Sequence, residues 1–188
     1  MSIVSANASI ISDYNKVTAA NDGWTAVYSG GYGTSFNYAA VLNGIAPGSQ
    51  VALASSSSTG STTFDLFAAT TLDVLQTITA TNQTIFADGT YWYRNGSSTG
   101  FTPNANISQS SADTIGIFSS SADSDLRLSW HGGATTAYGG WRSGNNAYLN
   151  ADNTWQRYVL VRSVPEPMTA ALLGLGLLAA GIARRRTR

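Results

Sequence analysis

The sequence has no cysteine, and it has only one lysine, one histidine and one glutamate among its 188 residues. Without cysteine the chain can form neither a disulfide framework nor a thiolate zinc site, and it has no thiol nucleophile. Charged residues make up 11% of the chain, against about 25% in an ordinary soluble domain. The formal net charge is zero, which argues against a nucleic-acid partner, because such proteins carry a basic stripe.

Small polar residues fill much of the chain in place of charges. Ser and Thr together number 45, and Gly adds 19. The apolar content of 43% is still large enough to bury a hydrophobic core. The length suits a single domain.

The few charges are unevenly spread along the chain. Residues 1–163 hold six basic side chains against nine Asp, a net charge of −3. The last 25 residues hold the only Glu and four Arg. This asymmetry indicates a terminal segment with a role of its own.

The terminal segment consists of a proline-rich motif, an apolar stretch and a basic tail. The motif is Val164, Pro165, Glu166 and Pro167. The apolar stretch, residues 168–183, has no charge, and as a helix it would span about 24 Å, short of the ~30 Å hydrocarbon core of a bilayer. The tail contains Arg184, Arg185, Arg186 and Arg188.

We expect residues 168–183 to form a single membrane-inserted helix, because the flanking arginines can snorkel and thin the bilayer locally. The basic tail then holds the C-terminus in the cytoplasm and the body outside. A buried helix of a soluble protein is the alternative, and it leaves the terminal Arg cluster unexplained.

The motif, the short apolar stretch and the Arg cluster, in this order, resemble the PEP-CTERM sorting signal of Gram-negative bacteria. The resemblance implies recognition by an exosortase-like membrane protease-transpeptidase and an association with exopolysaccharide production. It also implies a single-pass inner-membrane intermediate, followed by a location at the cell surface or outside the cell. The same segment also carries the label of an ice-binding protein C-terminal domain, which establishes no activity for the body.

An outward-facing anchor requires an export signal at the other end of the chain. Residues 1–20 contain no complete signal peptide, but Ala6-Asn7-Ala8 has the form of a signal-peptidase site. We therefore expect residues 1–8 to be the remnant of a signal peptide that starts upstream of Met1. Coincidence in a sequence rich in small residues is the alternative.

Residues 9–163 show apolar–polar alternation broken by turn clusters, which predicts an all-β extracytoplasmic domain, an antiparallel β-sandwich or jelly roll. Asn95-Gly96 predicts a hairpin turn after an aromatic strand. Residues 125–131 place Leu126, Leu128 and Trp130 on one face, and we expect the polar residues between them to face water. A short helix is the alternative for residues 70–80. The predicted strands are 24–29, 36–42, 50–54, 63–68, 72–80, 90–94, 113–118, 125–131 and 155–161.

No pattern in the sequence predicts catalysis or a cofactor. His131 is the only histidine, and Ser129 beside it lacks the G-x-S-x-G context of a nucleophile. A glycosidase needs two positioned carboxylates, and the only glutamate lies in the sorting motif. Asp123 and Asp125, with Asn150 and Asp152 elsewhere, are weak Ca²⁺ candidates, because Asp in a Ser-rich loop commonly caps turns. We therefore expect a protein that is not an enzyme.

Aromatic residues offer the best candidate contacts with a ligand. Trp92, flanked by Tyr91 and Tyr93, and also Trp141, could stack on the rings of a polysaccharide, while filling of the core is the alternative. Residues 77–81 place three Thr on one face. An ice-binding face needs many such rungs, so we expect an ordinary solvent-facing strand there.

The sequence therefore predicts an exported, exosortase-sorted surface or matrix protein, structural or adhesive in a polysaccharide-rich layer. The alternative is a specific carbohydrate- or calcium-binding module.

Overall fold

The computed structural model describes residues 9–78, 83–95, 98–103, 126–131 and 141–163. Within these ranges the chain forms two β-sheets with three short α-helices and one 3-10 turn. The elements of the first half are β1 (Ile11–Asn15), α1 (Lys16–Asn21), β2 (Thr25–Gly31), α2 (Tyr38–Asn43), β3 (Gln50–Ser56), β4 (Thr63–Thr71) and α3 (Leu72–Thr77). Those of the second half are β5 (Gln83–Ala87), β6 (Thr90–Asn95), β7 (Ser98–Thr102), β8 (Leu128–His131), β9 (Arg142–Ser143), η1 (Leu149–Ala151) and β10 (Gln156–Arg162).

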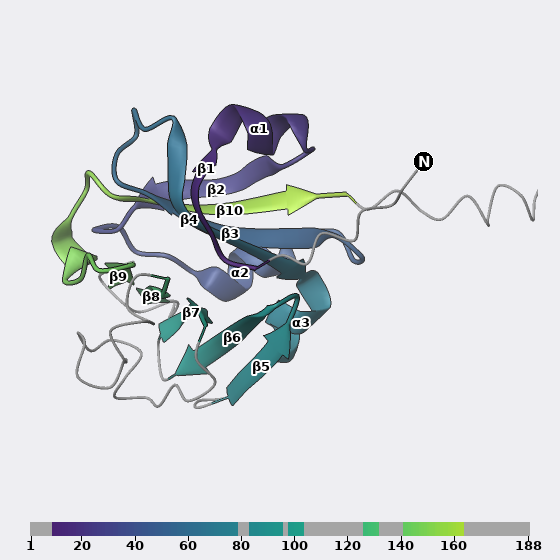
Figure 1. The fold of residues 1–188 in the computed structure, drawn as a ribbon. Coiled ribbons are helices and arrows are strands. Elements are labelled where there is room, and N and C mark those ends of the chain that lie inside the picture. Colours follow the sequence, from purple (N-terminus) through teal and green to yellow (C-terminus); the bar gives the residue numbers. More distant parts are fainter. Residues whose placement is uncertain (1–8, 79–82, 96–97, 104–125, 132–140, 164–188) are drawn as a thin grey trace, which may run out of the picture.

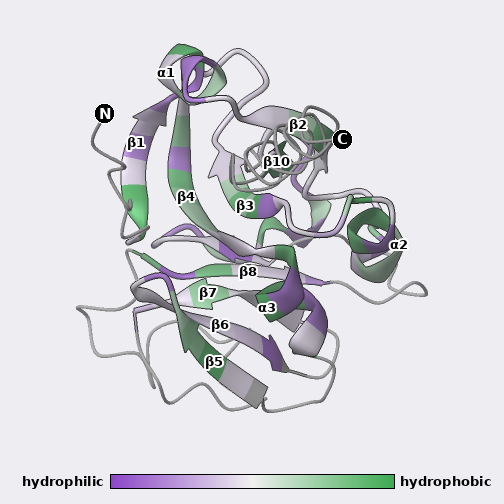
Figure 2. Ribbon diagram, turned by 90° about the vertical axis from the view of Figure 1, so that its right-hand side faces the viewer, coloured by the Kyte–Doolittle hydropathy of each residue, from purple (hydrophilic) through white to green (hydrophobic). Residues whose placement is uncertain are grey.

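The two sheets each contain five strands, and every neighbouring pair is antiparallel. Sheet A has the order β1-β4-β3-β10-β2, and sheet B has the order β5-β6-β7-β8-β9. Figures 1 and 2 show them as two layers, with α1 on the far side of sheet A from sheet B. The prediction of antiparallel β-structure is confirmed. Sheet B is a meander in chain order, which fits a sandwich and not the two Greek keys of a jelly roll.

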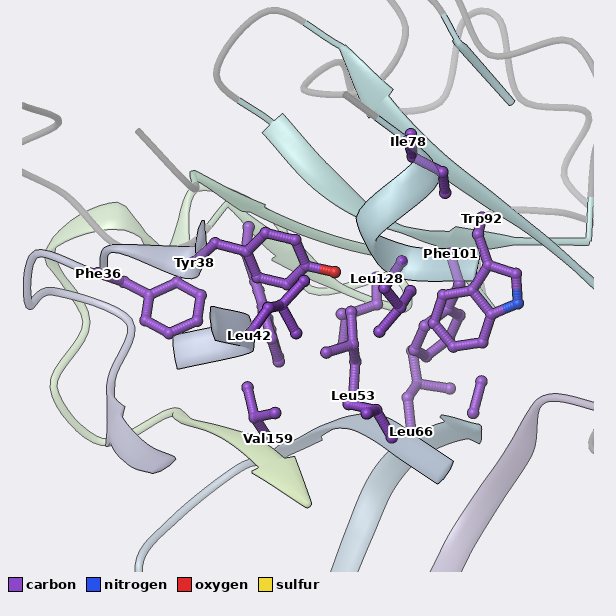
Figure 3. Close-up of a cluster of buried hydrophobic side chains, with 14 of the residues drawn as sticks. Phe36, Tyr38, Leu42, Leu53, Leu66, Ile78, Trp92, Phe101, Leu128 and Val159 are labelled. Carbon is purple, nitrogen blue, oxygen red and sulfur yellow. The ribbon is translucent and has the colours of Figure 1, made fainter. Parts of the chain in front are cut away.

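The main hydrophobic core lies between the two sheets (Figure 3). Sheet A contributes Leu53, Leu66 and Val159, and sheet B contributes Trp92 and Leu128, all of them buried. Buried side chains of α2 and α3 extend the same cluster. Because inward residues alternate along each strand, this core accounts for the period-2 pattern in the sequence.

Sheet A also buries much of its outer face. Ala52, Ala54 and Leu160 form a second cluster there. Ala19 of α1 and Trp24, which lies between α1 and β2, belong to the same cluster. Asn15 caps the start of α1, because its side-chain oxygen accepts hydrogen bonds from the backbone N–H groups of Val17 and Thr18, as is typical of an N-cap. Sheet A is therefore covered by sheet B on one face and partly by α1 on the other.

Two predicted strands are helices in the structure. Residues 36–42 were expected to be a strand, but α2 occupies Tyr38–Asn43, because the Asn37 side chain caps it by accepting from the Ala40 N–H at 3.0 Å. Residues 72–80 were also expected to be a strand, but Leu72–Thr77 is α3, capped by Thr71. The helix alternative holds there, and Thr77 belongs to this helix and not to a face of three threonines on a strand.

The expected water-facing side of residues 125–131 is wrong where the structure describes it. Arg127 is 1% exposed and Ser129 is 0% exposed, so β8 is buried on both faces. The hairpin prediction is confirmed, because β6 and β7 pair with Asn95 opposite Ser98. Strands β1, β5, β7 and β9 were not predicted, and the predicted strand 113–118 lies outside the described residues.

A search of the described residues finds no helix that is long and apolar enough to cross a membrane. The predicted helix 168–183, the predicted signal-peptide remnant 1–8 and the basic tail all lie outside those residues.

Gly100 in β7 gives a direct test of this packing. A Cβ at this position would overlap the carbonyl oxygen of Leu128 on the neighbouring strand β8. We expect Gly100→Ala to lower the free energy of unfolding by about 3 kcal/mol or more, because strand backbones cannot move apart cheaply inside a sheet. Thermal or denaturant unfolding measures this.

The matched control is Gly60→Ala in an exposed turn, where an added Cβ meets no atom within 4 Å. Its stability should stay within about 0.5 kcal/mol of the original chain. Equal stability of the two variants would contradict the β7–β8 pairing.

Candidate functional site

A row of rings that ends in one exposed ring lies at the β8–β9 edge of sheet B. We call it the aromatic ridge, and it consists of His131, Trp141 and Tyr148. The Tyr148 ring is 68% exposed and meets Trp141 edge-on, with ring centroids 4.8 Å apart and an interplanar angle of 77°. Trp141 in turn stacks on His131 at 6.3 Å and 25°. The ridge thus passes from a half-buried imidazole to a tyrosine ring in solvent.

The backbone holds the ridge in place. The Trp141 N–H donates to the Ser129 carbonyl of β8 at 3.0 Å, and the Leu149 N–H donates to the Trp141 carbonyl at 3.0 Å. Tyr148 adopts a left-handed conformation with φ of 61°, which is uncommon for a bulky residue. Its neighbour Leu149 is buried in the main core. Burial of Leu149 therefore fixes the chain on one side while the Tyr148 ring points outward.

Polar groups accompany the ridge. Among the described residues, the Trp141 indole nitrogen and the Asn150 side-chain oxygen are buried and make no hydrogen bond. Buried polar atoms are usually paired, so these two are exceptions, and neither lies at the surface where a ligand binds. The polar group that the ridge exposes together with its ring surface is the Tyr148 hydroxyl, which can donate and accept.

Asp152 closes the loop that follows Tyr148. Its Oδ1 accepts from the Thr154 N–H at 2.7 Å, the Thr154 hydroxyl at 2.6 Å and the Trp155 N–H at 3.3 Å. The Thr154 hydroxyl, with the two backbone donors, lowers the pKa of the Asp152 carboxyl below its usual value. The side chain predicted as a weak Ca²⁺ ligand therefore caps a turn.

The two main calcium candidates are not residues of the Asp152 turn. Asp123 and Asp125 lie outside the described residues. Within the described ranges, no group of three or more His, Cys, Asp or Glu side chains is placed to hold a metal ion.

The aromatic residues predicted as sugar contacts differ in burial. Trp92 is 0% exposed, and its indole N–H donates to the Ala87 carbonyl at 3.2 Å. Tyr93 is buried, and its hydroxyl donates to the Leu128 carbonyl at 2.8 Å. A buried ring offers no face to a ligand, so the core alternative holds for these two. Tyr91 is half-buried beside Phe86.

The structure does not bring all the predicted aromatics together. Tyr91 packs on strand β5 at one edge of sheet B, whereas Trp141 lies beside β9 at the opposite edge. The sequence missed Tyr148, which completes the ridge. The run Gly144-Asn145-Asn146 indicates a loop, but only the tertiary structure decides which side chain that loop leaves exposed.

The sorting segment follows directly on the last strand. Strand β10 ends at Arg162, whose guanidinium lies over the Trp24 ring at 4.7 Å and whose Nε donates to the Gln50 side chain at 2.9 Å. Only Ser163 separates this anchored residue from Val164. The motif Val164–Pro167 itself lies outside the described residues.

Comparison with known proteins identifies this segment. Residues 163–186 match the family model of the PEP-CTERM protein-sorting motif, so the resemblance seen in the sequence is confirmed. Arg184, Arg185 and Arg186 lie inside the match, and Arg188 lies beyond it. Neither the curated proteins nor the solved structures contain a match to this chain.

Proteins that carry this motif are delivered to a common destination. A PEP-CTERM signal is recognised by an exosortase, which is a membrane protein. It indicates export through a membrane-anchored intermediate and sorting to the cell surface or the extracellular space. The match covers the end of the chain only, so the role of the β-body has to come from its own surface.

The turn capped by Asp152 should make the stability of the fold depend on pH. A carboxyl whose pKa is lower in the folded state contributes stability above its unfolded pKa and loses it as the pH falls through the folded value. We expect Asp152→Asn to cost about 1 kcal/mol at neutral pH, and this cost should shrink below about pH 4. Denaturant unfolding at pH 7 and pH 3 measures both values. A cost that does not change with pH would contradict the charge-assisted turn.

Proposed function

We propose that this chain is an exported, non-enzymatic protein of the cell surface or extracellular matrix, which an exosortase sorts and which adheres to polysaccharide. The observation that carries the adhesive part is the aromatic ridge, where a tyrosine ring is held in solvent by a fixed loop. Aromatic rings favour the apolar faces of sugars, while nearby polar atoms bond to hydroxyl groups.

The ridge suits adhesion better than chemistry. Its rings and polar atoms can hold a chain of sugars but offer no pair of carboxylates for hydrolysis. The single imidazole, His131, stacks behind Trp141, and the neighbouring Ser129 is buried in β8. Binding without turnover is what a structural or adhesive component of a polysaccharide layer requires.

In this proposal the sorting segment anchors the chain in the membrane before processing. Residues 168–183 form a short transmembrane helix, and the four tail arginines stop its transfer, since each costs about 2.5–3.5 kcal/mol at the bilayer centre. Their excess on one side keeps the tail in the cytoplasm. The β-body therefore stays outside until the exosortase releases it.

Tyr148→Ser tests the adhesive role. Loss of one stacking ring is worth about 0.5–1.5 kcal/mol, so we expect retention on the producing cell's own polysaccharide to fall about two- to tenfold. Co-sedimentation of the protein with that polysaccharide measures retention. The melting temperature should change little, because the removed ring is mostly in solvent.

Phe86→Ser is the matched control, because Phe86 is a similarly exposed ring, 61% accessible, at the opposite edge of sheet B. It should keep full retention. If both variants bind as well as the original chain, the ridge is not the adhesive surface.

The double variant Glu166→Ala, Pro167→Ala tests the sorting stage. In an exosortase-bearing host we expect it to stay uncleaved in the membrane fraction, because the enzyme loses its recognition motif. The body should keep its stability to within about 0.5 kcal/mol, since the changes lie beyond the last strand. Thr187→Ser, outside the matched motif, is the control and should be processed normally. Normal release of the double variant would refute exosortase dependence.

A further inference from the structure

A cleft of about 230 Å³ opens beside the outer face of sheet A, and Asp88 of the β5–β6 turn also lines it. It lies at the end of the sheet where β3 begins and where β4 and β10 end. Three aromatic residues from separate elements line it, namely Tyr14 of β1, Trp24 before β2 and Phe67 of β4. No aromatic residue nominated from the sequence belongs to this set.

The rings of the cleft pack against one another around Phe67. Tyr14 meets Phe67 edge-on with ring centroids 4.8 Å apart, and Trp24 meets it at 5.3 Å. Phe67 and Trp24 are buried, whereas Tyr14 is half-buried. The cleft therefore has a fixed apolar wall that does not depend on a mobile side chain.

Polar side chains of both kinds surround this wall. The Tyr14 hydroxyl donates to Oδ2 of Asp22 at 2.5 Å, and the Thr70 hydroxyl donates to Oδ2 of Asp88 at 2.7 Å. Within the described part of the chain, Oδ1 of each carboxylate makes no hydrogen bond. Both aspartates are exposed, so these oxygens are free to accept hydrogen bonds from a ligand.

The donor side of the cleft is Arg162. Its Nε and Nη2 bond to the Gln50 side-chain oxygen, and its guanidinium rests on the Trp24 ring. A guanidinium carries five N–H donors, so donors remain for a ligand. The Arg162 charge is held in position by the ring and the amide, which reduces the entropy lost on binding.

We infer that this cleft binds a single neutral sugar ring. A sugar hydroxyl both donates and accepts, which matches acceptors on Asp22 and Asp88 together with donors on Arg162. The apolar face of the ring can lie against Tyr14, which is only half-buried, and against the parts of Trp24 and Phe67 that line the cleft. The volume lies below the roughly 300–1,000 Å³ of sites for drug-sized ligands, so one ring fits.

The charges of the cleft argue against ionic ligands. Two carboxylates repel an anion such as a uronate, while the guanidinium over Trp24 already occupies the place where a ligand cation would stack. The Tyr14 hydroxyl keeps Asp22 oriented over the whole physiological range. Burial, helped by the hydrogen bond to Asp22, raises the pKa of Tyr14 to about 12.

The inference rests on the proposed function for its ligand class, but the site is separate. The cleft is lined mainly by residues of sheet A, whereas the aromatic ridge lies at the β8–β9 edge of sheet B. Figure 1 shows the two sheets as separate layers. The two surfaces share no residue, so variants can remove either one alone. A chain with both surfaces would hold two sugars at once.

The test uses the full chain in a detergent without a sugar headgroup, titrated with glucose, galactose, mannose and N-acetylglucosamine. We expect at least one of them to bind and to shift signals of the Trp24 indole in an NMR spectrum. Asp22→Asn and Arg162→Gln should each weaken binding about tenfold or more, because each removes a charge-assisted partner.

Two control variants separate the outcomes. Asp73→Asn changes an exposed carboxylate on α3, outside the cleft, and should bind as the original chain does. Tyr148→Ser removes the ridge and should also leave the cleft affinity unchanged, so failure of the proposed adhesion and failure of the cleft are distinguishable. A sugar-induced shift of the Trp24 signals that survives both Asp22→Asn and Arg162→Gln would overturn the inference, because these signals report the cleft and not the ridge. So would tighter binding of glucosamine or a uronate when they are titrated in the same way, or the absence of a Trp24 shift with all four neutral sugars.

Discussion

The rest of sheet A depends on its last strand, β10. Strand β2 joins the sheet only through β10, which pairs with β3 on its other side. Arg157 on this strand is buried among the rings of Tyr28 and Phe36, and it donates to the carbonyls of Gly31 and Thr34 at 2.8 Å each. Burial lowers the pKa of Arg157, but the carbonyls and rings compensate the cost of burying this cation. The final strand therefore fixes β2 and the turn after it.

This constraint connects the fold to the sorting motif. Residues 163–186 match the motif, and β10 ends at Arg162, so the folded sheet reaches the signal with no intervening linker. Sheet A lacks its strand between β3 and β2 until the residues just before the signal have been added. The match therefore begins directly after Arg162, at the end of the sheet where Arg162 and Gln50 pair.

The sequence predicted the parts of the fold that repeat along the chain. Alternation in β3, β4, β6 and β10 reports local geometry, and these strands appear in the structure. Strands β6 and β7 also pair as the hairpin that Asn95-Gly96 predicts. Residues of the helices α2 and α3 were predicted to be strands. In such short segments a single capping residue, Asn37 or Thr71, is enough to favour a helix. The prediction that polar residues face water was also wrong for Arg127 and Ser129, which are buried. Which aromatics line a surface or a cleft depends on long-range packing, so the sequence carried no signal for the positions of Tyr148, Tyr14 and Trp24.

If both proposed sites bind sugar, two weak contacts on separate surfaces let a small body hold a polymer. Each surface alone offers one or two rings and a few hydrogen bonds, which limits its affinity. A polysaccharide presents the same unit many times, so the second contact becomes intramolecular once the first has formed, and avidity can exceed either affinity by about 10² or more. The proposed cleft is lined mainly by sheet A and the proposed ridge lies on sheet B, so the two contacts need not engage the same polymer chain. Under the proposed function, binding of two different chains by one body would cross-link a matrix.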